Sequence, residues 1–289
     1  MAGTPALERT EMRNIARPRA RRAMRSVVVL RGMSTGYVGL LIIVPIIAIS
    51  VRALEGGPGR IWSDLTQPDA LFSIRLTFLM ALLMIAINSI MGTMTAWVLV
   101  RYRFPLQSVV NALIDLPFAI PTVVTGLMLV VLYGPQSSVG TFLSDRGLEI
   151  VYAKPGIILA LLFVTYPFVV RAVQPVLMEM EMEMEEAAAT LGAGRWTIFR
   201  KVVLPSITPA VLTGAAQAFS RAIGEFGSVV IVAGNIPMKT QVASVYVYGE
   251  IESYNPRGAL GISVALLASS LAILVLLNLI QLWGRKHDV

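Results

Sequence analysis

Residues 186–205 read EAAATLGAGRWTIFRKVVLP, a polar stretch that lies between two long apolar segments. Its Glu-Ala-Ala start favours a helix. Gly192 and Gly194 then interrupt that helix, because glycine adopts left-handed backbone conformations at little cost. Residues 195–203 predict a second short, amphipathic helix, and Pro205 suits the first turn of the helix that follows. We therefore expect two short helices joined by a bend, which together offer a docking surface.

The composition is that of an integral membrane protein. Of the 289 residues, 56% are hydrophobic and 14% are charged, and the mean hydropathy is +0.73, whereas soluble domains carry about 25% charged residues. The net charge of +7 comes from arginines in the N-terminal tail and in short loops, a distribution that suits a membrane surface better than nucleic acid. The chain has no cysteine, and its one histidine, His287, lies in the C-terminal tail. Disulfides, thiolate metal sites and most histidine catalysis are therefore excluded.

Apolar segments long enough to cross about 30 Å of hydrocarbon recur along the chain. They predict an all-α polytopic membrane protein with six transmembrane helices in a membrane domain over residues 32–284. A basic tail at 1–31 precedes this domain, a polar loop at 179–205 interrupts it, and a short tail at 285–289 follows it. The expected spans are 32–53, 74–100, 109–133, 155–177, 206–233 and 258–283.

The distribution of basic residues orients these spans. An even number of spans puts both termini on one side of the membrane. That side, counted over both tails and the loops at 101–108 and 171–205, holds sixteen Lys and Arg, whereas the opposite side holds seven. The positive-inside rule therefore predicts that both termini and the bent segment face the cytoplasm. The outer connections are too short for a domain of their own.

The sequence offers no catalytic centre. A phosphate loop needs closely spaced glycines before Lys-Ser or Lys-Thr, and Lys239-Thr240 lacks them. We therefore expect a non-catalytic chain without a bound cofactor or metal. The glutamates between 179 and 186 alternate with methionines. We interpret that run as a solvated helix rather than a metal site, because no imidazole joins it.

Three ionisable residues inside the expected spans are candidates for a transport path or gate. Asp115 precedes Pro117 and Pro121, so its span cannot be one straight helix. Either Asp115 caps or pairs with a freed backbone group near the membrane surface, or it lines a path. Arg221 and Glu225 are four residues apart and share one helical face near the middle of their span.

The Arg221–Glu225 pair also has two readings. An unpaired charge there would cost roughly 2.5–3.5 kcal/mol on insertion scales, so we expect the two side chains to neutralise each other. The pair either fixes helix packing or forms part of a gate or path for an anion. Gly224 and Gly227 flank Glu225 and permit close backbone approach or a break in the helix.

The bent segment resembles a known motif. Glu186-Ala187-Ala188, then Gly192, then Val202, Leu204 and Pro205 is similar to the cytoplasmic EAA motif of binding-protein-dependent ABC transporter permeases, with Val202 at a position that is usually Ile. Three further stretches, residues 115–122, 221–228 and 233–240, resemble the sulfate/thiosulfate permeases, and the Pro121-Thr122 ending looks like their T-type subunit. Molybdate and tungstate permeases share much of the Gly-Glu-Phe-Gly region. An ion-coupled secondary anion carrier is the alternative from another class.

The resemblance implies a type I ABC importer permease in a bacterial inner membrane. It implies two copies of a separate ATPase subunit, a second and homologous permease subunit, and an extracytoplasmic sulfate-binding protein. It further implies that the bent segment sits in a groove of the ATPase and transmits its closure in an alternating-access cycle. The residues that would carry this coupling are Glu186, Ala187, Ala188, Gly192, Leu204 and Pro205.

Overall fold

The computed structural model describes residues 29–285, and all its regular elements over that range are helices. The expected tails at 1–31 and 285–289 lie outside the described residues, apart from residues 29–31 and 285. The chain divides into two units, residues 1–56 and 57–289, which are described separately.

The first unit contributes one apolar helix. Residues 29–54 form a 26-residue helix with a mean hydropathy of 2.3, long enough to span a membrane. A π-helical turn, η1 (Gly39–Ile43), precedes α2 (Val44–Leu54). Pro45 has no N–H to continue the regular hydrogen-bond ladder, and widening the preceding turn accommodates it.

The second unit is built from helices that often begin at proline, whose fixed φ suits the first helical turn. Its elements are α3 (Pro58–Leu65), α4 (Pro68–Arg101), α5 (Gln107–Ile114), α6 (Leu116–Ala119), α7 (Thr122–Tyr133), α8 (Ser138–Ser144), α9 (Lys154–Glu179), α10 (Met182–Thr190), α11 (Arg195–Ile198), η2 (Phe199–Val203), α12 (Leu204–Ile223), α13 (Gly227–Ala233), α14 (Ala243–Glu252) and α15 (Pro256–Arg285).

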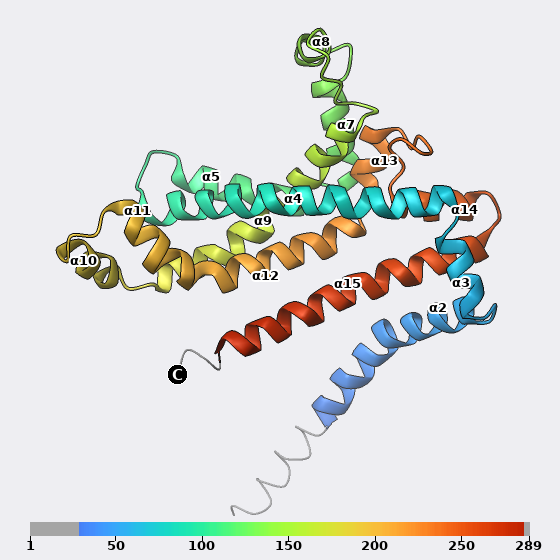
Figure 1. Cartoon of the computed structure of the whole chain (residues 1–289), viewed down its shortest axis with the longest axis horizontal. Coiled ribbons are helices and arrows are strands. Elements are labelled where there is room, and N and C mark those ends of the chain that lie inside the picture. Colours follow the sequence, from blue (N-terminus) through green and yellow to red (C-terminus); the bar gives the residue numbers. More distant parts are fainter. Residues whose placement is uncertain (1–28, 286–289) are drawn as a thin grey trace, which may run out of the picture. The chain divides into compact units, whose positions relative to one another are not determined.

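Helices α4, α9 and α12 form the centre of this unit, and α15 packs on α12 and α14 (Figure 1). Small residues allow the central helices to approach closely. A Cβ placed on Gly92 of α4 would lie 2.9 Å from Val169 Cβ of α9, and one on Gly214 of α12 would lie 2.7 Å from Val169 Cα. Val169 is thus held between two glycines on the helices to either side.

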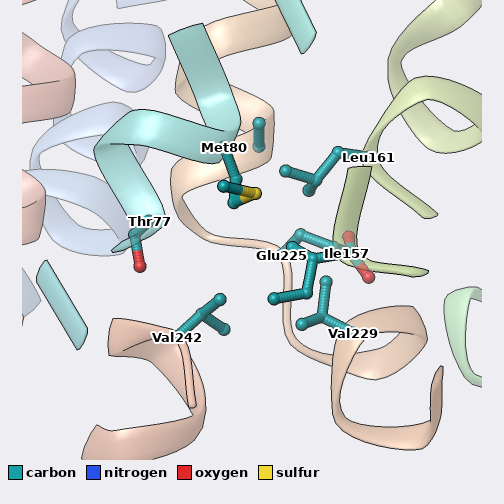
Figure 2. Close-up of a pocket in the computed structure, with 8 residues that line it drawn as sticks. Thr77, Met80, Ile157, Leu161, Glu225, Val229 and Val242 are labelled. Atoms are coloured by element: carbon teal, nitrogen blue, oxygen red, sulfur yellow. The ribbon is translucent and has the colours of Figure 1, made fainter. Parts of the chain in front are cut away.

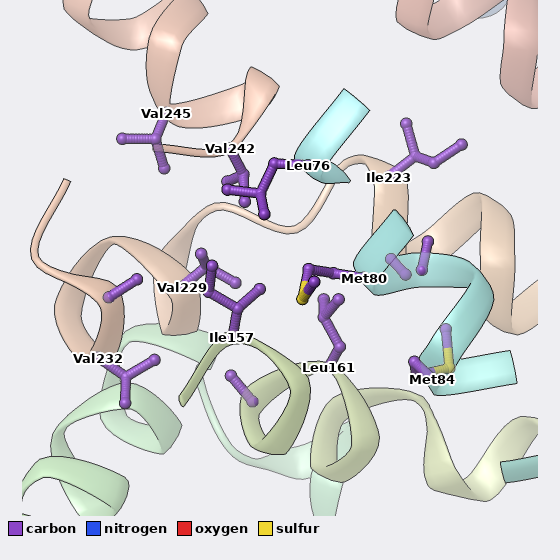
Figure 3. Close-up of a cluster of buried hydrophobic side chains, with 14 of the residues drawn as sticks. Leu76, Met80, Met84, Ile157, Leu161, Ile223, Val229, Val232, Val242 and Val245 are labelled. Atoms are coloured by element: carbon purple, nitrogen blue, oxygen red, sulfur yellow. The ribbon is translucent and has the colours of Figure 1, made fainter. Parts of the chain in front are cut away.

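The main apolar core joins these helices to α13 (Figure 3). Met80 of α4, Ile157 and Leu161 of α9, and Val229 of α13 gather there, all buried. A polar contact crosses the same interior, where Asn88 Nδ2 donates to Thr165 Oγ1 at 2.9 Å. The α4–α9 pair therefore combines close packing with a satisfied polar bridge.

The third expected span is sharply bent, as its two prolines predict. Residues 107–119 and α7 meet at 113° across the break at Ile120-Pro121. Helix α7 then packs against α13 (Figure 1). The contact is close, because a Cβ on Gly126 would lie 2.7 Å from Ser228 O and one on Gly227 would lie 2.3 Å from Thr122 Oγ1.

The structure corrects the expected fifth span. Instead of one helix over 206–233, a continuous helix runs from Arg195 to Ile223, and residues 227–233 form the separate helix α13. The helix continues through Pro205 because the π-helical turn η2 precedes that proline, as η1 precedes Pro45. It ends at Ile223, and the buried Glu225 carboxylate beyond Gly224 accepts from the backbone N–H of Ser228 in α13.

By length and composition, the described residues hold five helices able to cross a membrane, or six if the bent third span is one of them. Two of the expected spans, the third and the fifth, are broken, and the helices that follow their breaks, α7 and α13, pack together. This pairing positions the ionisable residues described below.

Candidate functional site

The bent segment is an elbow between α10 and α11, residues 182–198. Helix α10 ends in a Schellman motif, in which Gly192 N donates to Ala189 O at 2.9 Å and Ala193 N donates to Ala188 O at 3.0 Å. Gly192 has φ +84, the left-handed conformation that this cap requires. The bend expected at Gly192 is therefore present, and hydrogen bonds of the elbow's own backbone define it.

Two contacts to the end of α4 hold the elbow. Arg101 Nη2 donates to Glu185 Oε1 at 2.6 Å, and both side chains are mostly buried. Trp97 meets Phe199 of η2 edge to face, with ring centroids 5.5 Å apart. The Arg101 guanidinium also lies over the Trp97 ring, 5.7 Å from its centroid. One end of α4 thus braces both arms of the elbow.

The outer surface of the elbow is open and partly apolar. Leu191 is 89% exposed and Trp196 is 71% exposed, on either side of Gly192. A Cβ at Gly192 would meet no heavy atom within 4 Å. Large exposed apolar side chains at a bend outside the spans suit a protein partner better than water.

The residues to which the resemblance assigns coupling lie partly in this elbow and partly in the first turn of α12. Glu186 and Ala187 are exposed, and Ala188 is half-buried. Leu204 and Pro205 are exposed in the first turn of α12, within the continuous helix that begins at Arg195. The second short helix expected at 195–203 is therefore not separate from the span that follows, and Pro205 opens no new helix.

Asp115 is a partner for a charged side chain rather than a cap. It lies at the start of α6, but its carboxylate caps no backbone N–H there. Instead Arg171 of α9 binds it bidentately, with Nε donating to Oδ1 at 2.7 Å and Nη2 to Oδ2 at 2.6 Å. Arg171 also donates to Asn111 and Gln174. This network ties the bent third span to α9.

Arg221 and Glu225 form the ion pair that their spacing predicts. Arg221 Nη1 lies 2.6 Å from Glu225 Oε2. The other carboxylate oxygen accepts from Ser228 N at 3.0 Å and from Ser228 Oγ at 2.9 Å, so it pairs one backbone N–H in the first turn of α13. Ser244 Oγ of the following segment donates to Glu225 O at 2.6 Å. Glu225 therefore holds together three elements around the break.

The two members of this pair differ in exposure. The Glu225 side chain is 1% exposed, whereas that of Arg221 is 36% exposed. The Glu225 side chain also lines a small cavity of about 10 Å³, room for about one water. Figure 2 shows its carboxylate directed away from Thr77 and Val242 across that cavity. Only the arginine end of the pair is open to a ligand or a partner.

Several of these residues are not among those expected from the sequence. Glu185, rather than Glu186, anchors the elbow, and its partner Arg101 is 84 residues away. The sequence shows Arg171 only as a charged residue near the end of an expected span, and no local pattern distinguishes Asn111 or Gln174. Among the described residues, no group of three or more His, Cys, Asp or Glu side chains is placed to hold a metal ion. The glutamates of α10 accordingly lie on a largely exposed helix.

Most of the chain is similar to proteins of a known family. Residues 88–285 match the family model described as binding-protein-dependent transport system inner membrane component. The "Sulfate transport system permease protein CysT" of Synechocystis sp. is 43% identical over 251 residues, which cover 87% of this chain and 88% of that protein. The protein of the same name from Escherichia coli is 38% identical over 268 residues, covering 92% and 97%.

Solved structures show the same fold. The crystal structure of a bacterial ABC transporter involved in the import of the acidic polysaccharide alginate contains a chain that superposes with a TM-score of 0.72 at 17% identity. The match covers 91% of this chain and 98% of that one. A second structure of a bacterial alginate ABC transporter, in complex with an alginate pentasaccharide-bound periplasmic protein, gives a TM-score of 0.71, also at 17% identity, over 92% of this chain and 95% of that one.

Proposed function

Because the chain belongs to the family of binding-protein-dependent transport system inner membrane components, we propose that it is the permease subunit of an ATP-driven importer for sulfate or thiosulfate. The substrate assignment draws on relatives that are named sulfate transport permeases and cover most of the chain. Molybdate or tungstate is the alternative substrate, and an ion-coupled secondary anion carrier is the alternative mechanism.

The observation that carries this proposal is the elbow at Gly192. Its shape is set by its own backbone, its outer face bears Leu191 and Trp196, and one helix connects it to the Arg221–Glu225 pair. That helix has 29 residues, so it spans roughly 43 Å. A partner that moved the elbow would therefore also move the other end of this helix, next to the break at Glu225.

We assign the elbow to an ATPase because the sequence has no phosphate loop of its own. Two ATPase copies would seat the elbows of this chain and of a homologous second permease, and an extracytoplasmic binding protein would deliver the anion. This arrangement requires both termini and the elbow to face the cytoplasm, as the count of basic residues predicts. The family description itself names a binding protein as a component of such systems.

The three path or gate candidates take different parts in this proposal. Asp115 is bound to Arg171 from both oxygens, so we assign it to the junction between the bent span and α9. Glu225 is buried and holds the break between α12 and α13. Arg221 is the member whose side chain is open, and we place it on the anion path.

Purification of the chain from its native membrane tests the proposal directly. We expect an ATPase subunit to co-purify, and labelled sulfate uptake to cease when that subunit is deleted. Uptake that persists without the ATPase and collapses with the proton gradient would instead establish a secondary carrier.

A matched pair of glycine variants tests the elbow. Gly147 has φ +78, would meet no heavy atom within 4 Å if a Cβ were added, and ends α8 with the same pattern of hydrogen bonds as Gly192. Gly192→Asp and Gly147→Asp therefore carry similar backbone strain. We expect Gly192→Asp to lower ATP-dependent sulfate uptake by about tenfold or more at unchanged membrane abundance, a loss of about 1.4 kcal/mol of coupling. Gly147→Asp should retain uptake, and normal uptake in Gly192→Asp would remove the coupling role.

A further inference from the structure

A polar stripe lies on the last two turns of α12, whose apolar residues are buried in the core. Ala218, Phe219, Ala222 and Ile223 are buried in the core shared with α4 and α9. Gln217, Arg221 and Gly224 follow one another at spacings of four and three residues, which places them on a common face of the helix. Gln217 and Gly224 are exposed, and Arg221 is partly exposed.

This stripe does not suit contact with lipid. Arg221 lies 15 positions beyond Ser206, or roughly 22 Å along the helix axis, inside the expected hydrocarbon region. Charged and amide side chains in such a segment face protein or water, because hydrocarbon offers them no hydrogen-bond partners.

Gly224 leaves room beside the stripe that nothing in the described chain fills. Its φ is −89, so its backbone conformation is open to any residue. A Cβ at this position would meet no heavy atom within 4 Å. Neither strain nor crowding within residues 57–285 therefore explains a glycine here, in contrast to Gly227, where a Cβ would clash with Thr122.

The chemistry of the stripe fits an oxyanion. A sulfate dianion carries four oxygens that only accept hydrogen bonds, and it needs donors on every side. The Gln217 amide and the Arg221 guanidinium supply such donors on one face. Glu225 occupies the Nη1 side of that guanidinium at 2.6 Å, so the pair carries no net charge. Directed donors without net charge suit a site that an ion enters and then leaves.

We propose that Gln217, Arg221 and Gly224 form a contact site for a tetrahedral oxyanion in transit, with Arg221 and Gln217 as donors and Gly224 as the space for the ion. Glu225 is a positioning residue, which fixes the guanidinium from behind and does not touch the anion. This assignment rests on the proposed function, since it deepens the path already assigned to Arg221.

Variants that separate the anion contact from helix packing test the site in the complete transporter. The double variant Arg221→Gln/Glu225→Gln removes the positive charge without leaving a buried carboxylate unpaired. Gln217→Leu removes one donor, and Gly224→Val fills the open space. Arg75→Gln is the control, because it removes one exposed arginine that belongs to α4 and not to the stripe on α12. The measurements are the initial rate of labelled sulfate uptake and the ATP hydrolysis stimulated by the loaded binding protein.

We expect the double variant to lower sulfate uptake by about tenfold or more, because the anion loses one charge-assisted hydrogen bond. Gly224→Val should lower it to a similar extent because its side chain occupies the space of the ion, and Gln217→Leu should lower it severalfold. Stimulated ATP hydrolysis and membrane abundance should remain near wild type in all three variants, and Arg75→Gln should transport normally.

Wild-type sulfate uptake in the double variant overturns the site. A parallel loss of uptake and ATP hydrolysis also overturns it, because that result assigns the stripe to packing. Failure of the proposed function gives a different result, since uptake by the unmodified protein would then not depend on ATP.

Discussion

Two helix breaks in this chain, at Gly192 and at Gly224, both contain glycine but are held in different ways. At the elbow, Gly192 adopts φ +84, and the bend is closed by hydrogen bonds to Ala188 and Ala189 of the same helix. At the break in the fifth span, Gly224 has the ordinary φ of −89. There the carboxylate of Glu225 holds the structure together through Arg221 and Ser228.

The comparison separates a local bend from a non-local one. The bend at Gly192 is closed by hydrogen bonds of its own backbone, and the contacts from α4 reach the elbow only on either side of that bend, at Glu185 and Phe199. The second break depends on contacts with α7, α12 and the segment that follows α13, so any movement there must involve several helices. A rigid input at one end of α12 and a cooperative junction at the other fit a helix that carries a conformational change.

The largest loss of stability is expected when Glu225 is removed from the second break. Glu225→Ala leaves Arg221 without a partner and frees the N–H and hydroxyl of Ser228 in the interior. The Ser228 N–H and hydroxyl would each lose a buried acceptor, at about 1–3 kcal/mol apiece, so we expect a marked fall in membrane abundance and in thermal stability in detergent. Glu225→Gln keeps an acceptor for Ser228 and should cost distinctly less. Wild-type stability in Glu225→Ala would show that the carboxylate does not hold the break.

The next effect tests the packing beside the same break. In Gly227→Ala the new methyl group would lie 2.3 Å from Thr122 Oγ1 and 3.0 Å from Val123 N. Overpacking of this kind costs about 1–3 kcal/mol, and the unfolding midpoint in detergent should fall accordingly. Gly224→Ala, three residues away, meets no neighbour and should leave the midpoint nearly unchanged. A Gly224→Ala variant as unstable as Gly227→Ala would contradict the difference between the two glycines.

The sequence predicted the features that depend on neighbours along the chain. The bend at Gly192, the broken third span at its prolines and the Arg221–Glu225 pair all follow from local spacing. Contacts between distant segments could not be read in this way, because the bridges from Arg101 to Glu185 and from Arg171 to Asp115 join residues 84 and 56 positions apart.

The fifth span shows why local signals also mislead. Proline normally opens or breaks a helix, so Pro205 suggested a new start, but the π-helical turn η2 absorbs it. The end of that helix at Ile223 depends on Glu225 capping α13 through Ser228, which hydropathy does not report.

The bridge from the elbow to α4 should have a smaller effect. Arg101→Gln and Glu185→Gln each break an ion pair that is 11% and 19% exposed at its two ends. A double-mutant cycle on unfolding should give a coupling of about 1 kcal/mol, less than the loss in Glu225→Ala. We expect a transporter that contains either single variant to import less sulfate per ATP hydrolysed than the wild-type transporter. A coupling near zero would mean that Trp97 and Phe199 alone brace the elbow.

The smallest effect on global unfolding is expected at the elbow itself, where only backbone conformation changes. Gly192→Ala must place an L-residue in the left-handed region, at a cost of about 1–2 kcal/mol, whereas asparagine tolerates that region better. Because α10 lies outside the spans, we expect this strain to loosen α10 without moving the global unfolding midpoint. Hydrogen exchange of residues 183–191 should therefore be faster in Gly192→Ala than in Gly192→Asn. If Gly192→Ala instead lowered the global midpoint as Gly227→Ala does, the elbow would not be the self-contained bend that distinguishes it from the break at Glu225.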